Sequence, residues 1–388
     1  MTRVLGVMAI VAAGCFSCHH SEPSPQFRVT GPSMGDALPG PHVRHRCPLC
    51  QFVTRCDPLP GTGELTCQNC GTTAPLSEHH LNSRHPGTPV RLQRPHEIRR
   101  WQLVAFPHQN RWLVKRIVGL PGEQIALHEG EVWVHGRRVV KSAEDFRRVA
   151  VLVHDDRFRT DQTRRWAGSN AHWQAIPGGY RWVGQELPAS EPLVYAHVEP
   201  ALVAAAVHQV YDSYGYNQGL SRKLHVVEDL ALCGQVTLTG DVRLTLIARN
   251  GTDVTWESPR DTVRFGAQTA PLAPGKATRF WFGTWDGATH LTIGSEELDS
   301  VETGVGDPAG PAFQFEAEGS GTVELRDLQL YRDLYHLAGP AGTWRLEDDQ
   351  CLLLGDNVPR STDSRTDVIG PIAVSVLRAI ALDDTAGR

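Results

Sequence analysis

Apolar and polar residues alternate with a period of two along much of the chain. Between 242 and 248, the apolar residues Val242, Leu244 and Leu246 are separated by polar ones. Such alternation indicates strands with one buried face. The pattern returns in other segments, and Gly, Pro and Asp turns separate them: residues 149–153, 279–298 and 321–334. The sequence therefore predicts a mainly β protein with a β-sandwich, of jelly-roll or concanavalin-like type, over residues 145–343.

Two blocks on either side of this sandwich share a different style of short strands and tight turns. They cover residues 94–139 and 343–382. A chain of 388 residues is long enough for two or three structural units. We therefore expect one antiparallel β domain of catalytic type, formed by residues 29–144 and 344–388, into which the sandwich is inserted.

Four of the nine cysteines form two C-x-x-C pairs with 16 residues between them. This spacing is typical of a zinc ribbon, in which two turns supply four thiolates to a closed structural site. Two disulfides are the alternative, because an exported chain meets an oxidising compartment. We expect a zinc-ribbon insertion over residues 45–75, and we interpret three further cysteines as small buried side chains. The proposed ligands are Cys47, Cys50, Cys67 and Cys70, and the buried cysteines are Cys56, Cys233 and Cys351.

The N-terminus has the pattern of an export signal. Arg3 precedes an apolar run that ends in Ala-Ala-Gly-Cys15, and the run is shorter than the roughly 20 residues of a membrane-spanning helix. The ending resembles a bacterial lipobox, which predicts a lipid anchor on Cys15, with residues 1–28 as signal, anchor and linker. An ordinary cleaved signal is one alternative. Haem attachment through the C-x-x-C-H spacing of Cys15 to His19 is another.

Charge and composition limit the classes of binding partner that we expect. The chain has 38 basic and 43 acidic residues with no long block of one sign, so no nucleic-acid partner is expected. Histidines in the loop from 77 to 87 are left unassigned. Five tryptophans of the sandwich region could line a carbohydrate groove, although such residues are more often core: Trp166, Trp173, Trp182, Trp281 and Trp285.

Within residues 110–125, Lys115 lies between Leu113 and Ile117 in an apolar run that predicts a strand, and a Gly-Leu-Pro-Gly turn signal follows. A lysine on a strand usually keeps its ammonium group in water, because its long aliphatic stem lets that group reach the surface. A buried one loses its charge more readily, so its neutral amine can accept a proton near neutral pH. Ser33, in a Gly/Pro turn, is a candidate nucleophile whose own N–H could face a developing oxyanion. By itself, such a serine is more often a turn residue bonded to its own backbone.

Three motifs in order, GPSM, VKRIVGLPGE and LLLGDNVPRSTDSR, resemble the bacterial type I signal peptidases. These are membrane-associated serine endopeptidases with a Ser/Lys dyad, and the resemblance covers residues 27–40, 95–140 and 343–372. It implies that Ser33 is the nucleophile and Lys115 the general base. The supporting residues that it implies are Met34 beside the nucleophile, Ser361 bonded to the lysine, and the pair Asp363 and Arg365, which holds the last loop.

The sequence departs from the family pattern at several points. Gly31 stands where some members have a hydroxyl that helps to hold the oxyanion, and Asp36-Ala37 replaces the usual Pro-Thr. A lipobox-like signal takes the place of the family's transmembrane anchor. The ribbon and the sandwich fill loops, where insertions are tolerated because closure entropy grows slowly with length.

Two functions are compatible with these patterns. The first is a serine endopeptidase that cleaves signal peptides from exported preproteins at the membrane surface, on the periplasmic side, without a catalytic cofactor. The second is an exported, inactive peptidase-like binding protein, whose sandwich and ribbon recognise a glycan or a protein. The distance between Ser33 Oγ and Lys115 Nζ separates them, because only the enzyme needs the two within about 3 Å.

Overall fold

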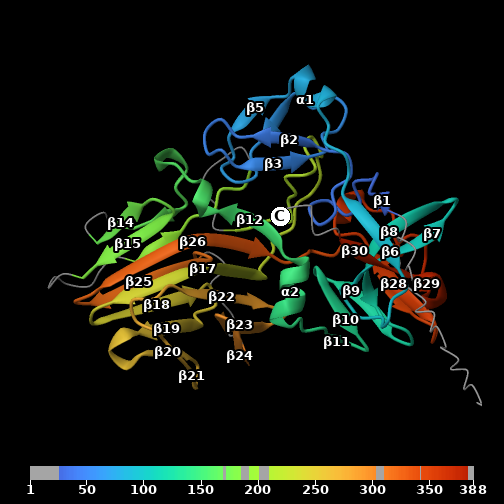
Figure 1. Ribbon diagram of the computed structural model, residues 1–388. Coiled ribbons are helices and arrows are strands. Elements are labelled where there is room, and N and C mark those ends of the chain that lie inside the picture. Colours follow the sequence, from blue (N-terminus) through green and yellow to red (C-terminus); the bar gives the residue numbers. More distant parts are fainter. Residues whose placement is uncertain are drawn as a thin grey trace, which may run out of the picture.

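The computed structural model describes residues 26–168, 172–184, 192–200, 209–302, 310–340 and 342–382. The predicted signal segment with Cys15 lies outside these residues, apart from its last three positions. Strands are the main regular structure of the described chain, and its helices are few and short (Figure 1). The mainly β class with an antiparallel sandwich is therefore confirmed. No helix among the described residues is both long and apolar enough to cross a bilayer.

The two blocks that flank the sandwich in sequence combine in one seven-stranded sheet. Strands from before residue 120 pair with strands from after residue 349, so chain segments more than 200 residues apart are neighbours. The strand order is β1 (Gln26–Arg28), β6 (Pro89–Gln93), β30 (Arg378–Leu382), β7 (Leu103–His108), β8 (Arg111–Gly119), β28 (Gln350–Leu354) and β29 (Ile372–Ala373).

A smaller sheet completes this split domain, the name used below for both sheets together. Its order is β11 (Arg137–Arg138), β10 (Glu131–Val134), β9 (Gln124–His128) and β27 (Thr343–Arg345). Ile125, Leu127 and Val132 from this sheet pack with Val118 and Leu352 of the larger one. Burial of these side chains holds the two sheets together, since apolar area removed from water is the main favourable term.

The sandwich consists of two antiparallel sheets around the largest apolar cluster of the described residues. The helix α2 (Ala143–Val149), capped by Ser142, leads into it. One sheet has the order β14 (Trp173–Ile176), β15 (Gly179–Val183), β26 (Thr322–Arg332), β17 (Leu230–Thr239), β22 (Thr278–Trp285), β23 (Ala288–Ile293) and β24 (Glu296–Glu302), with β12 (Val151–Asp155) also paired to β26. The other has the order β13 (Trp166–Ala167), β16 (Leu193–Tyr195), β25 (Phe313–Gly319), β18 (Val242–Ala248), β19 (Asp253–Glu257), β20 (Thr262–Phe265) and β21 (Gln268–Pro271).

Most of the tryptophans considered for a carbohydrate groove are core residues. Trp166, Trp173, Trp182 and Trp285 are each at most 3% exposed, and Trp281 is half-buried against Tyr331. Rings that are already packed on protein cannot stack on a sugar. The four buried tryptophans therefore do not line a groove.

The ribbon region is two short hairpins. β2 (Val43–Arg46) pairs with β3 (Val53–Cys56), and β4 (Glu64–Thr66) pairs with β5 (Thr73–Pro75). The first C-x-x-C pair lies in the turn of the first hairpin, and the second pair lies in the turn of the second. A short helix follows, α1 (Glu78–Asn82), whose N-terminus is capped by the Ser77 side chain.

Residues 209–228 differ from the sandwich predicted for this span. They form no strand between β16 and β17, apart from one isolated bridge, Tyr211 to Val226. Gly215 and Gly219 bring this segment against the ribbon, because a Cβ atom at either position would lie within 2.5 Å of Gln68 or Thr62. Gly and Asn break the strand pattern here, and the segment serves as a junction between units.

Candidate active site and metal centre

Lys115 is on β8 and its side chain is buried. Only 2% of the residue is exposed, and β8 runs between β7 and β28 in the larger sheet. Its Nζ atom donates a hydrogen bond to Ser33 Oγ at 2.8 Å. The structure therefore brings together the serine and the lysine that the sequence paired, from segments 82 residues apart.

Burial changes the acid–base behaviour of this lysine. It lowers the pKa of Lys115 from the ordinary 10.5 to about 8, and the charges of Asp363 and Asp356 offset part of that effect. Desolvation acts this way because it disfavours the charged form of any group. A substantial fraction of the amine is consequently neutral at mildly alkaline pH, which a general base requires.

Ser33 lies in a turn that follows β1. The Gly35 N–H donates to the Pro32 carbonyl at 3.0 Å, which closes the turn around the serine. Met34 is fully buried with Val29 and other apolar residues, so it anchors the loop in the core. Among the described residues no hydrogen bond uses the Ser33 N–H. Among the described residues, this N–H therefore has no partner that would keep it from an oxyanion.

The loop after β28 packs directly on the Ser33 turn. A Cβ atom on Gly355 would lie 2.5 Å from the Ser33 carbonyl oxygen, so only glycine fits there. The next residue, Asp356, receives two hydrogen bonds from Arg116, at 2.8 and 2.5 Å. Sequence reasoning missed Arg116, although its position beside Lys115 in the same motif was a usable signal. Asn357 donates from its backbone to the Ser33 carbonyl at 3.0 Å.

Asp363 and Arg365 form a buried pair that closes this loop. The guanidinium donates to both carboxylate oxygens, at 2.7 and 2.6 Å. Asp363 also accepts from the Gly355 N–H at 3.0 Å. Burial works to raise the pKa of Asp363, but the hydrogen bonds and charge of Arg365 outweigh it and leave the pKa below its usual value. The carboxylate is thus ionised at neutral pH and ties the two ends of the loop together.

Ser361 differs from the expectation that it bonds the lysine. Its Oγ atom is buried but has no hydrogen-bond partner of normal geometry among the described residues. It lies against Gly355, where an added Cβ would be 2.2 Å from it. Lys115 Nζ is directed instead to Ser33 Oγ. Ser361 thus lies next to Asp363, whose pKa its hydroxyl helps to lower, and no hydrogen bond joins it to Lys115 among the described residues.

The residues that depart from the family pattern also have defined surroundings. Gly31 has open space where a side chain would extend, so no side-chain hydroxyl is present at that position. Asp36 has a buried Oδ2 atom without a partner among the described residues. Burial raises the pKa of Asp36 to about 6, against the charges of Arg332 and Arg55. Those arginines belong to the sandwich and the ribbon, so Asp36 is influenced by both inserted units.

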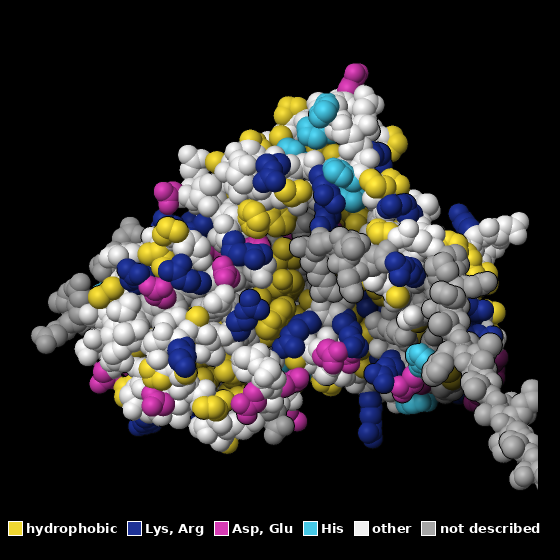
Figure 2. Space-filling model, in the orientation of Figure 1, with side chains coloured by type: hydrophobic (Ala, Val, Ile, Leu, Met, Phe, Trp, Pro, Cys, Tyr) yellow, Lys and Arg dark blue, Asp and Glu magenta, His cyan; other side chains and the backbone are white. Residues whose placement is uncertain are grey.

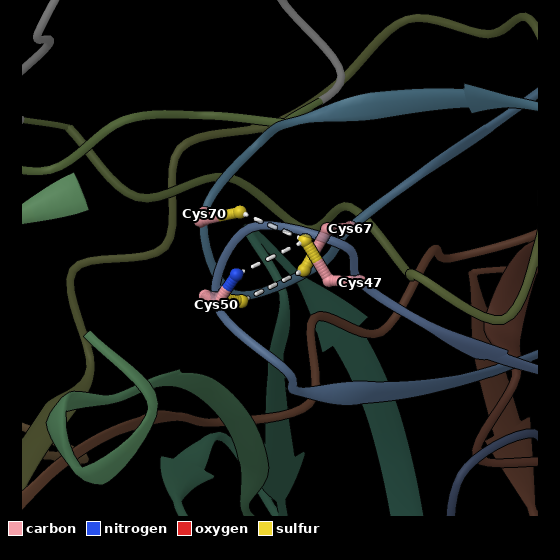
Figure 3. Close-up of side chains that lie close together, drawn as sticks. All are labelled: Cys47, Cys50, Cys67 and Cys70. Atoms are coloured by element: carbon pink, nitrogen blue, oxygen red, sulfur yellow. Dashed lines mark hydrogen bonds between the residues drawn. The ribbon is translucent and has the colours of Figure 1, made fainter. Parts of the chain in front are cut away.

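The four ribbon cysteines converge on one point (Figure 3). Cys47 Sγ lies 3.5 Å from Cys70 Sγ, and Cys50 Sγ lies 3.6 Å from Cys67 Sγ. A disulfide would need about 2.05 Å, whereas four sulfurs at about 2.3 Å from a tetrahedral zinc lie roughly 3.8 Å apart. The Cys50 N–H also points to Cys47 Sγ at 3.5 Å. The donor set and its spacing therefore fit a zinc ion.

The protonation of these thiols is mutually dependent. Hydrogen bonds from Cys50 and Cys67 lower the pKa of Cys70, whereas the hydrogen bond with Cys50 raises that of Cys67. Without a cation, a thiolate at Cys70 is stabilised by hydrogen bonds from the thiols of Cys50 and Cys67. A divalent cation would instead stabilise all four thiolates.

Histidines gather over the ribbon and α1, at the top of the molecule in Figure 2. His42 stacks on His85 with ring centroids 5.7 Å apart, and His45 contacts His80 at 5.6 Å. Among the described residues, their nitrogens do not converge as three ligands of one ion. The unassigned histidines therefore remain outside the metal centre.

A buried cluster of carboxylates joins the split domain to the sandwich. Lys141 Nζ lies 2.6 Å from Asp286 and 2.8 Å from Asp333, and Glu131 and Asp229 lie in the same group. Burial, followed by the charge of Asp229, raises the pKa of Glu131 to about 10. Protonation of Glu131 reduces the repulsion among the carboxylates of this cluster. The cluster can therefore join the split domain to the sandwich around the charge of Lys141. No local signal in the sequence indicates this cluster, because its members are scattered.

Known proteins match only parts of the chain. The signal peptidase family model, peptidase S26, matches residues 73–191, a span that contains Lys115 but not Ser33. No curated protein matches. A carbohydrate-binding module from Bacillus subtilis aligns with a TM-score of 0.28 at 10% identity, over 42% of this chain and 93% of the module. The galectin LEC-6 of Caenorhabditis elegans gives 0.21 at 13%, over 26% and 81%. Similarities to structures at this level carry no functional conclusion, whereas the family match supports a signal-peptidase-like domain in this chain.

Proposed function

We propose that this protein is a serine endopeptidase that uses a Ser33/Lys115 dyad to cleave signal peptides from exported preproteins. The observation that carries the proposal is the 2.8 Å contact of Lys115 Nζ with Ser33 Oγ inside a buried site. A binding protein has no need to bury a lysine against a serine, because an ammonium out of water is costly. The lowered pKa of Lys115 supports the same role.

The chemistry uses one base twice. The neutral amine of Lys115 accepts the proton of Ser33 Oγ as this oxygen attacks the scissile carbonyl carbon. The Ser33 N–H donates to the oxyanion that forms. Collapse of the intermediate breaks the peptide bond, and the lysine gives its proton to the leaving amine. The neutral amine of Lys115 then takes a proton from water as the water oxygen attacks the acyl-serine, and it returns this proton to Ser33 Oγ when the acid leaves.

The expected substrates and location follow from the family resemblance and the N-terminal pattern. Preproteins with small residues such as alanine at the first and third positions before the cut are the expected substrates. We propose that Cys15 carries a lipid, which would keep Ser33 within 18 residues of the outer, periplasmic side of the membrane. The paired cysteines would hold a structural zinc, and the dyad would work without a catalytic cofactor.

Incubation of the purified protein with a preprotein tests the function. Wild type should release the signal peptide, and Ser33→Ala and Lys115→Arg should not, since a guanidinium cannot lose its proton. Lys276→Arg, an exposed change on the sandwich, is the control that should keep full activity. The value of kcat/KM should rise with pH and level off above about 8, as Lys115 loses its proton.

Two results would contradict the proposal. Full activity in Lys115→Arg would exclude the dyad, and so would a rate that does not change between about pH 6 and 9. Binding of a glycan or a protein by a wild type that cleaves nothing would instead favour the inactive peptidase-like binding protein.

A further inference from the structure

Asn217 reaches the active-site loop from the segment that joins the sandwich and the ribbon. Its Nδ2 donates to Asn357 Oδ1 at 2.7 Å, and Asn357 Nδ2 donates back to Asn217 Oδ1 at 2.8 Å. Both residues are buried, with exposed fractions of 8% and 0%. Two amides that satisfy each other in this way fix each other's orientation, because a flip of either one would oppose like atoms.

Asn357 in turn holds the backbone of the Ser33 turn. Its Nδ2 also donates to the Pro32 carbonyl at 2.8 Å, and its backbone N–H donates to the Ser33 carbonyl at 3.0 Å. One residue therefore binds the carbonyl oxygens on both sides of the Ser33 N–H and Cα. If the Asn357 amide flipped, its oxygen would face the Pro32 oxygen, and the turn would lose this contact.

The segment around Asn217 is itself fixed in place. Tyr214 donates from its hydroxyl to the Asp356 carbonyl at 3.0 Å. Gln218 accepts from the Thr66 N–H at 2.9 Å and donates to the Thr66 carbonyl at 3.2 Å. Asn217 therefore acts from a support that is attached to the ribbon on one side and to the catalytic loop on the other.

We propose that Asn217 is a positioning residue, which orients the Asn357 amide and thereby holds the Pro32–Ser33 backbone so that Ser33 Oγ meets Lys115 Nζ. The side-chain amide of Asn217 bonds to Asn357 and not to the dyad, so its effect is transmitted through Asn357. Its influence on the loop is a property of the fold, whereas its effect on turnover rests on the proposed peptidase function. The inserted unit thus contributes directly to the geometry of the site.

The test compares Asn217→Ala, Asn357→Ala, the double variant and a control in the full chain. Asn250→Ala is the control, because Asn250 also takes part in three hydrogen bonds, all within the sandwich. Hydrogen exchange of residues 30–40, read by mass spectrometry, follows the Gly35 and Ala37 amides, which close the turn. Preprotein cleavage gives kcat and KM, and the melting temperature checks folding. If Asn217→Ala does not fold, the isosteric Asn217→Asp takes its place.

Exchange in residues 30–40 should rise about tenfold in Asn217→Ala and stay unchanged in Asn250→Ala. The kcat value should fall about tenfold or more with KM nearly constant, since small misplacements of reacting groups slow the chemical step. The double variant should be no slower than Asn357→Ala, as expected for residues that act as one unit.

Unchanged hydrogen exchange of residues 30–40 in a folded Asn217→Ala variant would overturn the proposal. A double variant whose loss in kcat equals the product of the two single losses would overturn it as well, because the two residues would then act independently. These outcomes are separate from the failure of the peptidase function. If wild type cleaves nothing, the function is rejected, while the exchange of residues 30–40 still decides whether Asn217 positions the loop.

Discussion

Replacement of Lys115 by methionine should stabilise the fold at pH 7 while it abolishes activity. Folding shifts the pKa of this lysine from 10.5 to about 8, and each unit corresponds to about 1.36 kcal/mol. Burial of the ammonium therefore costs roughly 3 kcal/mol at neutral pH. Loss of the hydrogen bond to Ser33 would reduce the gain in stability by about 1 kcal/mol. Methionine is flexible and fills the space of the lysine stem, which leaves a net gain of about 2 kcal/mol.

The stability difference between wild type and Lys115→Met should depend on pH in a defined direction. Between pH 8 and 10.5 the unfolded lysine holds its proton while the folded one has lost it, so the stability of wild type rises with pH in this window. Below pH 8 both states are protonated and the full cost is present. The advantage of Lys115→Met should therefore be largest at pH 8 and below, and should shrink toward pH 10.5.

Chemical denaturation at pH 7 and pH 10, analysed with one m-value for both proteins, measures the difference. Lys276→Met is the matched control, because Lys276 is exposed and its replacement should change stability by less than about 0.5 kcal/mol at either pH. Equal or lower stability of Lys115→Met at pH 7 would refute the argument. A difference that stays the same at pH 7 and 10 would refute it as well.

Two further predictions concern the metal centre and the catalytic loop. The purified protein should contain one zinc per chain, and Cys67→Ser should lose the metal and melt at a lower temperature. The control is Cys233→Ser, which changes a buried cysteine outside the ribbon and should keep the metal. Metal analysis that finds no zinc, together with two disulfides by mass spectrometry, would contradict the zinc prediction. Asp363→Asn should lower the free energy of unfolding at pH 7 by about 3–5 kcal/mol, because Arg365 is left buried without its partner. The exposed pair of Asp161 with Arg164 is the control, and Asp161→Asn should cost less than about 1 kcal/mol. Since the pKa of Asp363 is depressed, its contribution should be present at neutral pH and lost as the pH falls below 3.8; equal losses in both variants would contradict this account.

The parts of the molecule that could be predicted from sequence are those with a local signal. The alternation of Val242, Leu244 and Leu246 is a direct consequence of strand geometry, and these residues are buried as expected. The cysteine spacing likewise encodes two turns that face each other. For Ser33 and Lys115, resemblance to a family supplied the pairing, because nothing local in either segment indicates a contact across 82 residues.

The parts that sequence reasoning missed depend on contacts between distant segments. Asn217 lies close to a glycine in a turn-like stretch, a setting in which asparagine is common for local reasons. Its partner Asn357 is 140 residues away. The group around Lys141 draws its carboxylates from two units, and Ser361 matched a motif yet faces Gly355 in the folded chain. In each case the missing information was which other segment approaches.

The insertions are connected to the split domain and to its catalytic loop by polar groups that would destabilise the fold without their partners. Lys141, which follows β11 of the split domain, has two carboxylate partners directly after sandwich strands, Asp286 and Asp333. Asp57 of the ribbon pairs with Arg360, which follows Asn357 closely in the catalytic loop. Buried or half-buried charges and amides of this kind need their partners, because an unpaired polar group retains its desolvation cost. The sandwich and the ribbon therefore contribute to the stability of the split domain itself, and the loop that carries Asn357 is the element on which both converge.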